Sequence, residues 1–79
     1  MENYKECSED SFNIAMSMKD SPVSSIPDKF LYILYTKYCH DTFAVGTGYM
    51  NSYISGILID TKRKRDSYKE ELVKRGFIL

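Results

Sequence analysis

Four consecutive cationic side chains are the part of this sequence best suited to chemistry with an anionic partner. Lys62, Arg63, Lys64 and Arg65 follow one another, and Lys69 lies four residues further on. Lysine and arginine bind nucleic-acid phosphates with salt-dependent affinity, and arginine also recognises guanine through two hydrogen bonds. At a helix N-terminus such cations oppose the helix dipole, at a cost of about 0.3 kcal/mol or more per charge. An anionic partner would explain that unfavourable placement.

The distribution of charge along the chain supports this interpretation, although the chain as a whole is neutral. The 79 residues include 11 Lys and Arg and 11 Asp and Glu. Residues 1–20 hold two basic and five acidic side chains, whereas residues 61–79 hold seven basic and three acidic ones. A basic terminal segment is typical of nucleic-acid-binding proteins. The common alternative is a run of solvent-exposed charged residues that binds no partner. Zero net charge therefore does not exclude a nucleic-acid partner.

The cysteines, the histidine and the glycines indicate no catalytic chemistry. Cys7, Cys39 and His40 do not have the spacing of a structural zinc site. Neighbouring helical residues point about 100° apart, which places His40 poorly to activate Cys39 as a nucleophile. Gly46-Thr47-Gly48 lacks the further glycine or lysine of a nucleotide-binding loop and predicts a flexible turn. We expect no catalytic residue, metal site or cofactor, and the chain is not predicted to be an enzyme.

The length and composition predict one small cytoplasmic domain. A chain of 79 residues with 43% hydrophobic content forms a single modest core. Two cysteines are far fewer than the disulfide framework of a small secreted domain needs, which favours reduced thiols. The sequence does not exclude one disulfide between Cys7 and Cys39. The longest apolar stretch, residues 53–59, is far below the ~20 residues of a membrane span. We expect a single domain over 1–79, with an acidic N-terminal helix and linker over 1–25 and a core over 26–79.

Two helices are predicted in the first half of the chain. Ser8, followed by Glu9 and Asp10, is a suitable N-cap for a helix over residues 9–19. Residues 20–25 lack periodicity and are rich in turn formers, which indicates a linker. A second helix follows from Pro27 to Cys39, and its apolar residues cover more than half of its circumference. This second helix should be the most buried element.

The second half predicts a short strand and two further helices. Residues 43–45 form a short apolar patch typical of a strand, and residues 49–58 have strong helical periodicity. No residue is apolar over 60–67, so we expect the helix to break or protrude there. A short helix then ends at Gly76, in a register that places Leu72 against Phe77 in the helix cap. The apolar tail after Gly76 should be extended.

Residues 27–79 resemble a winged-helix or helix-turn-helix DNA-binding domain of phage and plasmid regulators. The similarity is carried by the order of these elements and by the spacing of Tyr68, Leu72, Gly76 and Ile78. The resemblance implies that residues 49–58 form the supporting helix and residues 61–75 the recognition helix. It also implies that DNA is contacted by the cationic residues Lys62, Arg63, Lys64, Arg65 and Lys69.

The fold class predicted is therefore mainly α, of helix-turn-helix type, with four helices and at most a short strand. The leading hypothesis for function is a small DNA-binding regulatory or replication-accessory protein, acting on duplex DNA as a dimer. The alternative is a protein-binding module, such as a small inhibitor or adaptor, because seven tyrosines suit an interface. Tyr4 and Tyr32 are the interface candidates, whereas Tyr35 and Tyr38 are expected at the rim of the core. A third possibility is a homo-oligomer held by residues 77–79.

Overall fold

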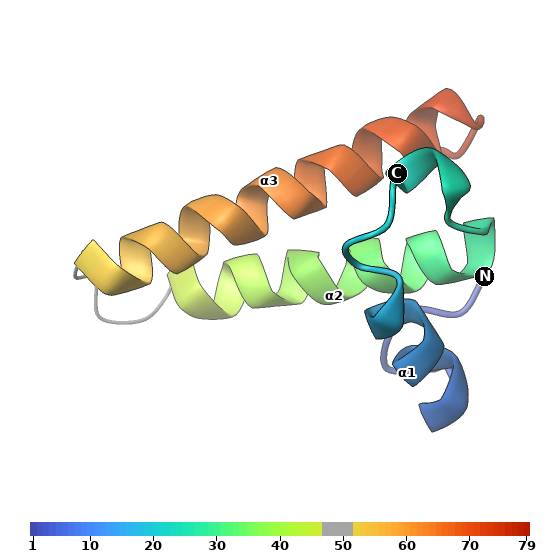
Figure 1. Ribbon diagram of the computed structural model, residues 1–79, viewed down its shortest axis with the longest axis horizontal. Coiled ribbons are helices and arrows are strands. Elements are labelled where there is room, and N and C mark those ends of the chain that lie inside the picture. The colour runs from blue at the N-terminus through green and yellow to red at the C-terminus, as the bar shows by residue number, and fades with distance from the viewer. Residues whose placement is uncertain (47–51) are drawn as a thin grey trace.

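The structure, a computed structural model, describes residues 1–46 and 52–79, with the side chains of 44–46, 52–55 and 57 left aside. Figure 1 shows the two long helices α2 and α3 side by side in opposite directions, with the short helix α1 at one end. These described residues form three α-helices and one 3₁₀ turn, η1, and they contain no strand. The mainly α class is confirmed, with three helices in place of the four predicted.

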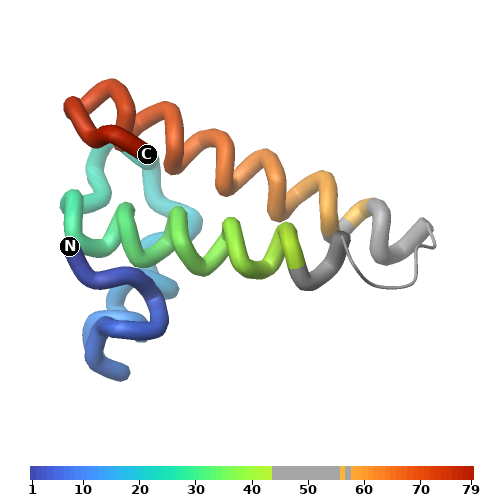
Figure 2. The backbone as a smooth tube through the Cα atoms, turned by 180° about the vertical axis from the view of Figure 1, so that it is seen from behind, coloured from blue at the N-terminus to red at the C-terminus, as the bar shows by residue number. Residues whose placement is uncertain are grey.

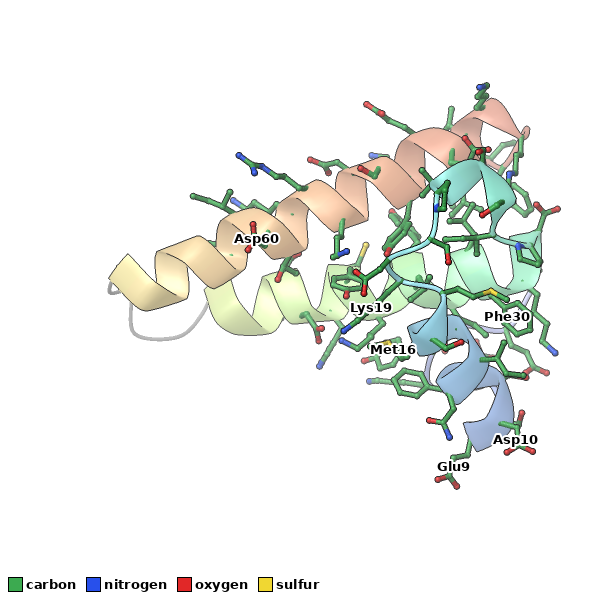
Figure 3. All side chains as sticks on the ribbon, viewed as in Figure 1. Glu9, Asp10, Met16, Lys19, Phe30 and Asp60 are labelled. Atoms are coloured by element: carbon green, nitrogen blue, oxygen red, sulfur yellow. The ribbon has the colours of Figure 1, made fainter. Side chains whose placement is uncertain are left out.

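Helix α1, Glu9–Ser17, begins where the sequence predicts. The Ser8 hydroxyl accepts a hydrogen bond from the Ser11 amide at 3.2 Å, which satisfies a donor that the first turn leaves open. Figure 3 shows Glu9 and Asp10 at the free end of this helix, pointing away from the two long helices. The helix ends two residues earlier than predicted.

The linker and the start of α2 also follow the prediction. A single 3₁₀ turn, Val23–Ser25, lies in the linker, and α2 begins at Asp28, directly after Pro27. Proline suits this place because its missing N–H would have no intrahelical partner there. Among the side chains that the structure describes, helix α2 supplies half of the buried hydrophobic residues, as predicted for the most buried element: Leu31, Ile33, Leu34 and Tyr38.

The strand predicted over residues 43–45 is wrong, because α2 continues through them to Gly46. The Thr42 hydroxyl donates to the Tyr38 carbonyl at 2.7 Å, and Lys37 forms an ion pair with Asp41 one turn later. A strand is stable only beside another strand, and the described residues offer none. The turn predicted at residues 46–48 is also wrong at Gly46, which is helical, while Thr47 and Gly48 lie outside the described residues.

The break or protrusion predicted over residues 60–67 is wrong as well. Helix α3 runs without interruption from Ser52 to Lys74, and residues 49–51 lie outside the described residues. A buried face passes through the predicted break because Thr61 is only 8% exposed and Tyr68 only 2%. The aliphatic stems of Lys64 and Arg65, both half-buried, cover the same side. A helix can therefore cross this segment without an apolar residue.

The helix-turn-helix type is not confirmed. The residues predicted as a supporting helix and as a recognition helix belong to one helix, α3, in the part of the chain that the structure describes. The cations at residues 62–65 therefore lie inside a helix instead of at its N-terminus. The unfavourable interaction with the helix dipole falls off within the first turn of a helix, so it does not apply to them.

The core lies between α2 and α3 and extends to α1 and the linker. Tyr38 and Tyr68 pack across the two long helices with ring centroids 5.6 Å apart. The other buried hydrophobic residues in the described part of the chain are Ala15, Ile26, Leu31, Ile33, Leu34 and Leu72. All three described α-helices and the linker therefore contribute to one hydrophobic cluster.

Candidate functional site

The five predicted DNA-contacting cations do not form one patch. Because successive residues of a helix point about 100° apart, residues 62 to 65 spread around most of the circumference of α3. Lys62, Arg65 and Lys69 recur at intervals of three and four and therefore lie on one side. Arg63 and Lys64 point to the other side, toward the linker. Helix α3 therefore separates the five predicted cations into one set on each of two sides.

Two of these cations are held by contacts within the chain. The Lys64 ammonium donates to the Lys19 carbonyl at 3.3 Å and lies 3.5 Å from the Asp20 carboxylate. The Arg65 guanidinium donates twice to the Asp66 carboxylate, at 2.9 and 3.0 Å. Such contacts with exposed carboxylates are weak and leave the cations available to a stronger partner.

The other three cations project into solvent. Lys62, Arg63 and Lys69 are exposed, and within the described residues they form none of the ion pairs. Acidic residues stand between them on the exposed side of α3, namely Asp60, Asp66 and Glu70. The exposed surface of this helix therefore has mixed charge.

Sequence reasoning missed an open apolar groove, although it named two of the segments that form it. The groove has a volume of about 490 Å³ and is lined by Met1, Tyr32, Tyr35, Phe77, Ile78 and Leu79. Ile78 is fully exposed at 100%, and Met1 and Leu79 are also exposed. Figure 2 shows that both chain ends lie at the end of the molecule where α3 terminates. The groove combines an aromatic wall from α2 with the two ends of the chain.

The helix cap predicted at Gly76 directs the tail into this groove. Gly76 has a φ of 98°, the left-handed conformation that glycine adopts most easily. The Phe77 amide donates to the Leu72 carbonyl at 3.0 Å, and the Gly76 amide donates to the Val73 carbonyl at 2.9 Å. These two bonds define a Schellman cap, which confirms the predicted register. The chain reverses there and brings residues 77–79 beside the tyrosines of α2.

Tyr35 connects the groove to the cationic side of α3. Burial and a hydrogen bond with Cys39 raise the pKa of Tyr35 above its ordinary value, while the positive charge of Arg65 acts in the opposite direction. Tyr35 was expected at the rim of the core and Tyr32 was an interface candidate. Both line the groove, and Tyr38 is buried in the core.

The cysteines and the histidine lie in ordinary contacts. Neither cysteine forms a disulfide, and the Cys7 thiol donates to the Tyr4 carbonyl at 3.4 Å. The Tyr4 and His40 rings pack with centroids 5.4 Å apart. Among the residues that the structure describes, no three His, Cys, Asp or Glu side chains gather as metal ligands.

Comparison with known proteins does not assign this mainly α chain to a family. No protein-family model, curated protein or solved structure matches the chain. Neither α2 nor α3 nor any other described helix combines the length and the hydropathy that crossing a bilayer requires. The described residues therefore define a small, mainly α protein with an apolar groove and a divided set of cations.

Proposed function

We propose that this chain is a protein-binding module whose groove accepts an amphipathic helix with acidic residues along one flank. The apolar groove carries this proposal, because six apolar or aromatic side chains converge there and one of them, Ile78, is fully exposed. Contiguous exposed apolar surface of this kind marks sites of interaction in small proteins. Tyrosine is also enriched at protein interfaces, because it combines a large apolar face with a polar tip.

The cations of α3 determine the chemistry of the partner. Arg65 lies close enough to Tyr35 to influence its ionisation. Lys62 and Lys69 share the side of α3 that Arg65 occupies, and they have no ion pair among the described residues. We infer that this side of α3, next to Tyr35, gives the groove a cationic edge, since Asp66 neutralises only one of the three cations. An amphipathic helix that binds such a groove would present acidic residues to this edge.

Two synthetic helical peptides with the same leucine face provide the test, one flanked by glutamates and the other by lysines. We expect the chain to bind the glutamate peptide and to lose about tenfold in affinity on Ile78→Asp, since the groove then loses one buried apolar contact. Ile14→Asp is the matched control, because Ile14 is an exposed apolar residue of α1, away from the groove. Fluorescence anisotropy measures both affinities.

Three results would contradict the proposal. Equal affinity for the glutamate and lysine peptides would show that the cations of α3 do not select the partner. An equal loss on Ile14→Asp would show that the contact is not specific to the groove. Sedimentation that shows a dimer dissociated by Ile78→Asp would make a second copy of the chain the occupant instead of a partner protein.

Duplex-DNA binding stays a second candidate. The observation that favours it is the exposure of Lys62, Arg63 and Lys69, which form no ion pair in the described part of the chain. Acidic residues between these cations and the division of the set by α3 make a continuous DNA-binding face less favourable. For this reason we favour protein binding in the apolar groove over duplex-DNA binding.

A further inference from the structure

We infer that the crease between the linker and α3 is a binding site for a phosphate group. A cavity of about 350 Å³ lies there, between residues 19–23 and one side of α3. The linker faces the viewer in Figure 1, whereas the tail that forms the apolar groove faces the viewer in Figure 2, from behind. This second site is therefore on the opposite side of the molecule and does not depend on the proposed function.

The charge of the crease favours an anion. Lys19, Arg63 and Lys64 line it with three positive charges, and Asp20 supplies the one carboxylate among its lining residues. The contact between Lys64 and Asp20 is long, at 3.5 Å, and the Asp20 side chain is 81% exposed. An exposed ion pair of this length is worth little, so a phosphate group can displace Asp20 from Lys64 at small cost.

The donors on α3 suit a tetrahedral oxyanion. Arg63 and Ser67 are four residues apart and project from the same side of the helix, next to Lys64. A guanidinium can donate two parallel hydrogen bonds to phosphate oxygens, a hydroxyl can donate a third, and the ammonium adds a mobile charge. Because the cavity is larger than a phosphate ion, there is space for a group attached to the phosphate.

The two walls of the crease are held together before any ligand binds. The Tyr68 hydroxyl donates to the Lys19 carbonyl at 3.1 Å, and the same carbonyl accepts from Lys64. Tyr68 itself is 2% exposed and belongs to the core. The linker is therefore fixed against α3, and little conformational entropy would be lost on binding.

The experiment titrates the full chain with inorganic phosphate, with adenosine monophosphate and with a short DNA duplex, each against chloride at matched ionic strength. Backbone amide shifts in NMR identify the residues that respond. We expect shifts concentrated at residues 19–23 and 63–68, and about a tenfold loss of affinity on Arg63→Gln. Lys74→Gln is the matched control, since it removes one charge from the same helix about 16 Å away along the axis. It should leave the affinity unchanged.

The three ligands distinguish the sources of the phosphate group. Binding of adenosine monophosphate without the duplex would assign the site to small phosphate compounds. Duplex binding that is weakened by Arg63→Gln but not by Lys74→Gln would assign it to nucleic-acid phosphates. The inference is overturned if none of the ligands shifts these residues, or if both variants weaken binding equally, which is the behaviour of diffuse charge attraction.

Discussion

At the scale of single residues, Tyr68 connects the core to the linker. Its ring packs against Tyr38 in the core, and its hydroxyl donates to the Lys19 carbonyl. Burial, assisted by electrostatic interactions with Tyr38 and Asp20, raises the pKa of Tyr68 to about 12. The protonated phenol is therefore the form that the folded state prefers.

This pKa shift predicts a loss of stability at alkaline pH. The folded-state pKa of about 12 lies above the ordinary value of 10.0, so the contribution is complete below pH 10 and disappears as the pH rises through 12. Its size is at most about 2–3 kcal/mol. Urea unfolding across this range should show a steeper decline for the natural chain than for Tyr68→Phe. Tyr4→Phe is the control, because Tyr4 is half-buried outside this contact, and it should retain the decline. Parallel curves for Tyr68→Phe and the natural chain would contradict the assignment.

Signals carried by neighbouring residues were the most predictable from the sequence. The Ser8 cap and the Schellman cap at Gly76 both depend on hydrogen bonds within a few residues, and both are confirmed. The groove was not predicted, because Tyr32 and Tyr35 meet residues 77–79 only through the tertiary fold. The periodicity of a sequence describes residues within one element and does not report contacts between residues far apart in the chain.

At the scale of secondary-structure elements, the continuity of α3 is the principal difference from the prediction. The segment 60–67 has no apolar residue, and the prediction assumed that a helix there would have no face to bury. Thr61 and the stems of two long cationic side chains provide that face instead. A criterion based on apolar residue types alone therefore missed it.

The glycines at the two ends of α3 provide opposite tests of its extent. Gly56 is helical and exposed, and a Cβ added there meets no atom within 4 Å. Gly56→Ala should therefore stabilise the chain by about 0.5–1 kcal/mol, because alanine restricts the unfolded chain more than glycine does. Gly76→Ala should destabilise it by about 1–2 kcal/mol, since the φ of 98° is unfavourable for alanine. Thermal unfolding followed by circular dichroism measures both. A destabilising Gly56→Ala would contradict a helix through residue 56.

For the molecule as a whole, carboxylates from the first half of the chain pair with cations of the basic C-terminal segment. Lys64 contacts Asp20, and Arg75 forms a 2.7 Å ion pair with Asp28, so part of the positive charge of residues 61–79 is neutralised internally. The charge sums identify residues 61–79 as the basic segment, but they overestimate the positive charge that is left for a partner. Which cations are neutralised depends on how α3 packs against the linker, and the sequence pattern does not contain this information.

Arg75 joins three parts of the molecule at the end where α3 terminates. Its guanidinium donates to the Asp28 carboxylate at 2.7 Å and to the Ile26 carbonyl at 2.8 Å. It also donates to the Glu71 carboxylate and to two carbonyls of the linker, those of Val23 and Ser24. The side chain is only 19% exposed. The hydrogen bonds to Asp28 and Glu71 raise the pKa of this guanidinium above its ordinary value and so favour its charged form.

This arrangement predicts that lysine cannot replace arginine at position 75. A lysine keeps the charge but has a single nitrogen, and so it cannot reach acceptors on the linker, on α2 and on α3 together. Arg75→Lys should therefore lower the free energy of unfolding by about 1–3 kcal/mol, nearly as much as Arg75→Gln. Lys74→Ala, at the exposed neighbouring position, should change it by less than about 0.5 kcal/mol. Urea unfolding measures all three.

Full stability in Arg75→Lys would mean that charge alone joins α3 to the linker. In that case the stability of Arg75→Gln should approach that of the natural chain as salt screens the pair.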